Sequence, residues 1–105
     1  MHIVITRPKE DSLYLIQNLI KLGHIVTHLP VIKIEKLETE KINLLNYQAV
    51  IFTSSNAIKF MNIERFNSKI KCFCVGKATE DAAKKIGFIN TYSSEGTVNS
   101  LIELI

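Results

Sequence analysis

Hydrophobic and polar residues alternate along the chain in blocks that predict strands followed by helices. Residues 2–6 are apolar and rich in β-branched side chains, as in a buried strand. Apolar residues then recur at helical spacing and predict one buried stripe, formed by Leu13, Ile16, Leu19 and Ile20. A second apolar run, residues 24–29, follows Gly23, which is a typical helix stop. Residues 1–30 are therefore expected to form a β-α-β arm.

The next stretch of the chain has a different pattern. Residues 31–39 alternate apolar and charged side chains, as in an exposed strand or an extended segment. We interpret them as a linker that can pair with another strand. Residues 40–46 are expected to form a short helix.

Within residues 40–105, a strand followed by a helix occurs three times after the short helix at residues 40–46. The predicted strands are residues 48–53, 70–75 and 88–92, and the predicted helices are residues 55–62, 77–86 and 97–105. Such alternation predicts an α/β fold, in which a parallel sheet carries helices on both faces. We expect residues 1–105 to form a single α/β unit.

Composition and charge narrow the class of protein. The chain has 105 residues, of which 47% are hydrophobic and 22% are charged, as in an ordinary globular domain. It has no apolar run of the roughly 18 residues that a membrane span needs, and no secretory signal, so we expect a cytoplasmic protein without membrane contact. The net charge of +3 comes from scattered residues. That pattern argues against nucleic-acid binding and is compatible with a polyanionic small molecule.

Several familiar kinds of site are not indicated by the sequence. Cys72 and Cys74 should point to the same face of a strand, and with no second ligand cluster we interpret them as buried reduced thiols. The three histidines have no metal-ligand spacing, so no metal is expected. Neither GxGxxG nor GxxxxGK[ST] occurs, which argues against a dinucleotide fingerprint and a P-loop.

Three junctions between a predicted strand and the following helix are small and polar. They read ITRP at residues 5–8, FTSSNA at residues 52–57 and CVGKAT at residues 74–79. Ligands of parallel α/β sheets collect at this edge, where helix amino termini attract anions. Each junction taken alone is more often a helix cap than a binding site, because Ser, Thr and Asn are common capping residues. Three of them at one edge favour a binding site.

These junctions also carry a resemblance to a known family. In order and spacing, the segments ITRP, PVIKI, YQAVIFTSSNAI and CVGKAT resemble uroporphyrinogen-III synthase along the whole chain. The resemblance implies a flavodoxin-like α/β fold. It also implies a lyase of haem biosynthesis that cyclises hydroxymethylbilane, a linear tetrapyrrole, with loss of water and inversion of the last pyrrole ring. No metal and no organic cofactor are implied.

The resemblance further implies which residues bind the tetrapyrrole. By family position, they are Thr53, Ser54, Ser55 and Asn56 at one junction, Gly76, Lys77 and Thr79 at the next, and Thr6 and Arg7 after the first strand. Hydroxyls, backbone N–H groups and a few cations suit a polycarboxylate ligand. The catalytic group stays unknown, because the tyrosine thought to assist the leaving hydroxyl in this family would lie beyond Ile105.

Members of the family are much longer and contain two α/β domains, so we interpret this chain as a truncated amino-terminal half. It is expected to form one flavodoxin-like sheet of order 2-1-3-4-5, to exchange its arm with a second copy in a homodimer, or to be completed by a separate carboxyl-terminal half. The alternative function is a non-catalytic α/β binding or interaction module, a remnant of the same fold.

Overall fold

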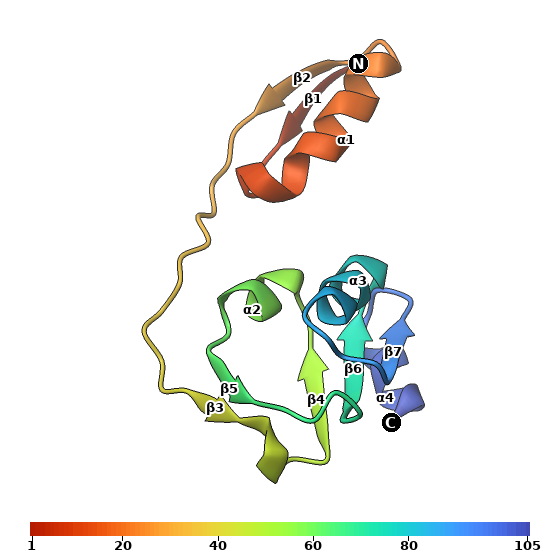
Figure 1. Ribbon diagram of the computed structural model, residues 1–105. Coiled ribbons are helices and arrows are strands. Elements are labelled where there is room, and N and C mark those ends of the chain that lie inside the picture. The colour runs from red at the N-terminus through yellow and green to blue at the C-terminus, as the bar shows by residue number, and fades with distance from the viewer. The chain divides into compact units, whose positions relative to one another are not determined.

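The computed structural model describes residues 1–105, which divide into two compact units. Unit 1 is Met1–Glu35 and unit 2 is Lys36–Ile105 (Figure 1). Residues 29–41 form neither helix nor strand. None of the helices is long and apolar enough to cross a membrane.

Unit 1 is a β-α-β arm, as predicted. It consists of β1 (His2–Ile5), α1 (Lys9–Lys21) and β2 (Ile25–His28). The two strands pair in parallel, with His2 beside Ile25 and Ile5 beside His28. Gly23 ends α1 in the left-handed conformation, with a φ of 85°, so that the His24 N–H can bond to the carbonyl of Leu19 at 3.0 Å.

The predicted apolar stripe of α1 is only half right. Ile16 and Leu19 are partly buried, but Leu13 and Ile20 are 52% and 57% exposed. The one fully buried residue of the helix is Ser12, whose hydroxyl donates to the carbonyl of Pro8 at 2.9 Å. A sheet of two strands is too narrow to cover a whole helix face, which explains why the flanking apolar residues stay in contact with solvent.

Unit 2 is built around a three-stranded parallel sheet. Its main elements are β4 (Ala49–Phe52), α2 (Ser55–Phe60), β6 (Lys71–Val75), α3 (Lys77–Lys85), β7 (Thr91–Ser94) and α4 (Val98–Leu104). The strand order is β4-β6-β7, so β6 is central. The chain is therefore α/β, with parallel strands and flanking helices, and the predicted fold class is confirmed.

Two details of unit 2 differ from the predictions. Residues 40–46 do not form a helix of their own. They contain the short strand β3 (Ile42–Asn43), which pairs with the unpredicted strand β5 (Ile63–Arg65), and a single 3₁₀ turn, η1 (Leu44–Asn46). The last strand also begins later than predicted, because Phe88 closes the end of α3 by donating its N–H to the carbonyl of Ala83 at 3.2 Å.

The predicted order 2-1-3-4-5 counts the predicted strands at residues 2–6, 24–29, 48–53, 70–75 and 88–92. Its two parts are present, because β1 pairs with β2, and β4, β6 and β7 follow one another in unit 2. The pairing of β1 with β4 that would join them into one sheet stays a prediction, and β3 and β5 form a separate pair.

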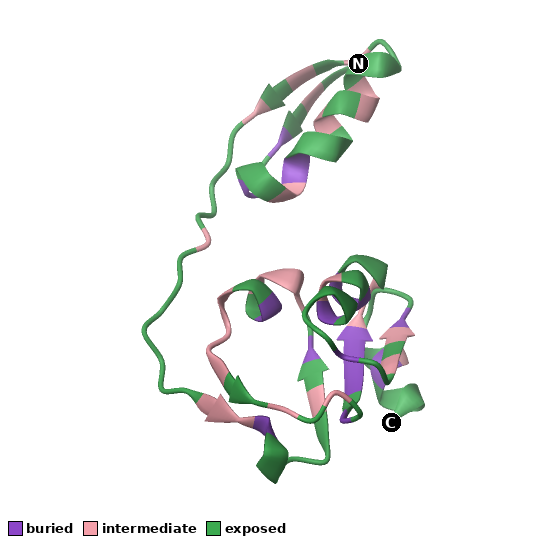
Figure 2. Cartoon of the chain, viewed as in Figure 1, coloured by how far each residue is buried: buried purple, intermediate pink, exposed green.

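The core of unit 2 lies around β6, as Figure 2 shows. Cys72 and Cys74 are completely buried there as free thiols, which confirms their prediction as reduced core residues. Phe52 and Phe88 pack edge to face, with ring centroids 5.8 Å apart. Burial raises the pKa of both thiols above the usual range of cysteine, so they pack as small apolar side chains.

Candidate functional site

The carboxyl ends of the three parallel strands of unit 2 lie at one edge of the sheet. Phe52 is level with Cys74, and Val75 is level with Ser94. The segments that follow these strands therefore emerge side by side, which is where parallel sheets bind ligands. The structure thus brings together seven of the predicted site residues: Thr53, Ser54, Ser55, Asn56, Gly76, Lys77 and Thr79.

At the first junction, part of the polar cluster is used to start α2. The Ser54 hydroxyl accepts a hydrogen bond from the Asn56 N–H at 3.2 Å, and the Ser54 carbonyl accepts one from the Ala57 N–H at 3.2 Å. Ser54 is therefore a helix cap. Thr53 is exposed, and Ser55 is partly exposed. Thr53 is therefore the most exposed residue of this polar cluster.

At the second junction, a glycine turns the chain from β6 into α3. Gly76 has a φ of 83° and a ψ of 153°, a conformation that essentially only glycine adopts. Its N–H donates to the carbonyl of Ser94 at 3.1 Å, so this junction is held against the carboxyl end of β7. Lys77 is exposed, whereas Thr79 is only 5% exposed. Thr79 thus presents little of its surface here.

A group of charged side chains begins at Lys77 and continues along α3. Oε1 of the nearly buried Glu80 lies 2.7 Å from the Lys84 Nζ and accepts a hydrogen bond from the Thr91 hydroxyl at 3.2 Å. The hydrogen bond from Lys84 holds the pKa of Glu80 below its usual range. The Lys77 Nζ lies 3.3 Å from an Asp81 oxygen and 3.8 Å from Glu80.

A third junction at the same edge was missed by the sequence reasoning. The Ser94 hydroxyl donates to the carbonyl of Thr97 at 3.0 Å, and the Thr97 hydroxyl accepts the Ser100 N–H at 3.1 Å as the cap of α4. The signal was the small polar run SSEGT at residues 93–97. It was overlooked because the preceding strand was predicted to end at Tyr92 instead of Ser94.

Thr6 and Arg7 lie in unit 1, after β1. The carbonyl of Thr6 accepts the Val31 N–H at 3.3 Å, and the carbonyl of Arg7 accepts a hydrogen bond from the His28 ring at 3.0 Å. The Arg7 side chain is exposed. The backbone of this junction thus ties the start of α1 to the end of β2.

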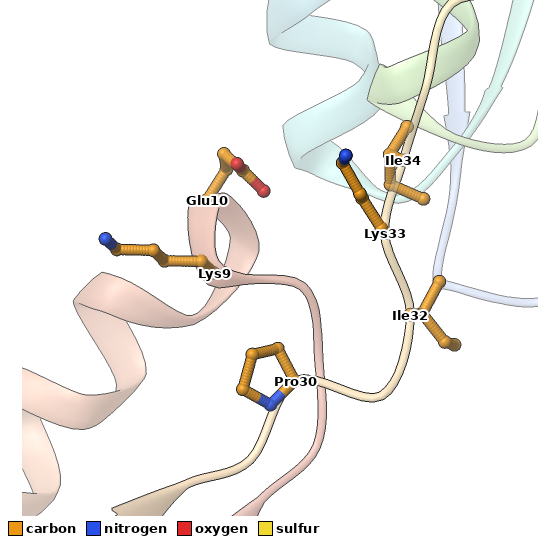
Figure 3. A pocket seen from close by; sticks show the side chains of 6 residues that line it. All are labelled: Lys9, Glu10, Pro30, Ile32, Lys33 and Ile34. Carbon is orange, nitrogen blue, oxygen red and sulfur yellow. The ribbon is translucent and has the colours of Figure 1, made fainter.

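Unit 1 also has a depression of about 340 Å³ beside this junction (Figure 3). Its lining comes from the start of α1 and from the segment after β2, and consists of Lys9, Glu10, Pro30, Ile32, Lys33 and Ile34. The Lys33 ammonium is already paired with Glu35 at 2.9 Å. In the whole chain, no group of three or more His, Cys, Asp or Glu side chains is arranged to hold a metal ion.

Comparison with known proteins shows to which family the chain belongs. The model of uroporphyrinogen-III synthase HemD matches residues 14–105, which contain the three junctions of unit 2. The chain belongs to the uroporphyrinogen-III synthase family. Thr6 and Arg7 lie outside the matched residues, so the family match does not extend to them.

One curated relative of the chain is the porphyrin biosynthesis protein HemD of Ruminiclostridium josui. The two sequences are 30% identical over an alignment of 107 positions, and the match covers 89% of this chain and 21% of the relative. The chain thus spans about a fifth of the length of the curated relative that it matches. No solved structure matches the chain.

Proposed function

We propose that the chain acts in porphyrin biosynthesis as a uroporphyrinogen-III synthase, in the cytoplasm. Its reaction would be the cyclisation of hydroxymethylbilane with loss of water and inversion of the last pyrrole ring. The observation that carries this proposal is the family match over residues 14–105, which includes a sheet edge lined by small polar groups. The relative from Ruminiclostridium josui is itself described as a porphyrin biosynthesis protein.

The chemistry of the carboxyl edge suits a polycarboxylate. Thr53 and Ser55 supply hydroxyl groups, Lys77 supplies a cation, and the first turn of α3 has N–H groups without intrahelical partners. Loss of the substrate's hydroxyl leaves a reactive azafulvene. The main task of such a site is then to hold one folded conformation of the bilane until the ring closes.

The proposed reaction is tested by measuring which uroporphyrinogen isomer the chain produces. The chain is incubated with hydroxymethylbilane and the products are separated into uroporphyrinogen III and the I isomer, which forms without enzyme. We expect type III product above the enzyme-free blank. Type I alone, from protein shown by circular dichroism to be folded, would contradict the proposal.

The second candidate function is a non-catalytic α/β binding or interaction module. Two observations favour it: the Ser54 hydroxyl serves as a helix cap, and Thr79 is almost completely buried. The Ser54 hydroxyl is thus used by the fold, and Thr79 presents little surface to a ligand. Binding of a tetrapyrrole without type III product would support this second candidate.

We also propose that the chain works with a partner, which is either a second copy that exchanges residues 1–30 or a separate carboxyl-terminal half. The support is the exposure of apolar residues in unit 1, where Val4 and Ile25 are 56% and 66% exposed. Units smaller than about 40 residues rarely bury enough apolar surface to fold alone. Light scattering after size-exclusion chromatography at several concentrations tests this proposal. A dimer supports exchange, and a monomer at every concentration excludes it.

A further inference from the structure

The charges at the start of α3 suggest how the affinity of the carboxyl edge is set. Lys77 is the first residue of α3 and its side chain is 70% exposed, so it can meet an anion that approaches this edge. Two carboxylates of the same helix lie within 4 Å of its ammonium. The two carboxylates, of Glu80 and Asp81, differ in their distance from this ammonium.

Glu80 is committed to other partners. Its Oε1 lies 2.7 Å from the Lys84 Nζ and 3.2 Å from the Thr91 hydroxyl, and its side chain is only 12% exposed. The Lys77 ammonium is 3.8 Å from this oxygen, which is too long for a hydrogen bond. Glu80 therefore fastens α3 to β7 and contributes only an electrostatic attraction to Lys77.

Asp81 is the closer carboxylate. Its Oδ1 lies 3.3 Å from the Lys77 Nζ, one helical turn along α3, and its side chain is 55% exposed. An ion pair exposed on both sides is weak, so a ligand carboxylate can replace it. The replacement still costs the free energy of the pair, and every ligand that uses Lys77 must meet that cost.

We propose that Asp81 is an affinity-setting residue, which competes with ligand carboxylates for Lys77. The inference rests on the proposed function of the carboxyl edge. A bilane and its cyclic product carry the same carboxylates, so binding through them stabilises substrate and product alike and does not speed ring closure. Excess affinity would only delay release of the product. Because Asp81 competes with the ligand for Lys77, it keeps the affinity of the carboxyl edge for these carboxylates low.

The test is a double-mutant cycle of Asp81→Asn and Lys77→Met, measured with two probes. The probes are uroporphyrin III, a tetrapyrrole polycarboxylate, and benzenehexacarboxylate, which has the charges without the tetrapyrrole. Glu103→Gln, an exposed residue of α4, removes the same charge elsewhere in unit 2 and is the matched control. Circular dichroism confirms that each variant is folded.

We expect Asp81→Asn to bind both probes about two- to fivefold more tightly, mainly through slower dissociation, at low ionic strength. The gain should disappear in the Lys77→Met background and shrink at high salt. An equal gain in Glu103→Gln, or a gain that survives Lys77→Met, overturns the proposal. If only benzenehexacarboxylate binds more tightly, the role of Asp81 is supported and the assignment of a tetrapyrrole ligand is contradicted. If neither probe binds, both the role of Asp81 and the tetrapyrrole ligand are contradicted.

Discussion

Single buried residues determine much of the behaviour of unit 2, and Glu80 is the clearest case. Its carboxylate joins α3 to β7 through Lys84 and Thr91. Glu80→Gln keeps the shape of the side chain but removes the charge, so two charge-assisted contacts are weakened. We expect a loss of about 1–2 kcal/mol in the free energy of unfolding, measured by urea denaturation. Glu103→Gln should change it by less than about 0.5 kcal/mol.

The pH dependence of the Glu80 contribution has a defined sign. The pKa of Glu80 is lowered in the folded chain by its hydrogen bond from Lys84. Its stabilising effect is therefore complete above the ordinary pKa of glutamate, about 4.3, and is lost as the pH falls through the lowered value. Urea titrations between pH 7 and pH 3 should show the wild type converging on Glu80→Gln. Parallel curves would contradict this assignment.

Cys72 and Cys74 provide a second prediction at the residue scale. Both thiols are fully buried and their pKa values are raised, so few thiolates form and no reagent can reach them. We expect no reaction with a disulfide reagent at pH 8 in the folded chain, and reaction of both thiols in denaturant. Because the unfolded thiols ionise first, stability should fall as the pH rises above about 8.5. Rapid labelling of the native protein would show that the core of unit 2 is open.

At the scale of elements, the turn from β6 into α3 depends on Gly76. Its φ of 83° and ψ of 153° lie in a region that is strained for any residue with a Cβ, although a Cβ would meet no atom within 4 Å. Gly76→Ala should therefore cost about 1–3 kcal/mol through backbone strain alone. Thermal unfolding measures the loss. A neutral substitution would mean that the junction adopts another conformation.

The same scale shows which elements the sequence predicts well. The strands at 48–53 and 70–75 and the helices that follow were predicted within a few residues, since Ser54 caps one helix and Gly76 opens the next. The strand after α3 was misplaced because Phe88 is apolar for another reason, namely to plug the end of that helix. β5 was missed because a strand of three residues has too few positions to show alternation.

At the scale of the whole molecule, the two units have unequal cores. Unit 2 has a cluster that includes Phe52, Ile58 and Phe88, whereas the buried residues of unit 1 are Ile5, Pro8 and Ser12. We expect the slowest hydrogen exchange in β6 and exchange near the rate of free peptide in β1. Residues 36–105 should fold alone, and residues 1–35 should not, as circular dichroism of each piece can show. Equal protection of the two units would contradict this ranking.

The candidate site was predictable only in part, for a reason that belongs to this scale. The carboxyl ends of β4 and β6 could be placed together because successive strands of a parallel sheet usually neighbour each other. Ser94 and Gly76 lie next to each other because of the register between β6 and β7, and this register cannot be predicted from the sequence. Burial of Thr79 also depends on the packing of α3, and no local pattern indicated it.

The outer edges of β1 and β4 have a practical consequence. Both strands end their sheets, and both have the same alternation of exposure, so that Val4 and Ile51 are more than half exposed. Neither strand contains a lysine, a glutamate or a proline, the residues that commonly prevent an edge strand from pairing with another chain. Concentrated solutions of the isolated chain should therefore aggregate by strand addition, and a single lysine at Val4 or Ile51 should keep the protein dispersed.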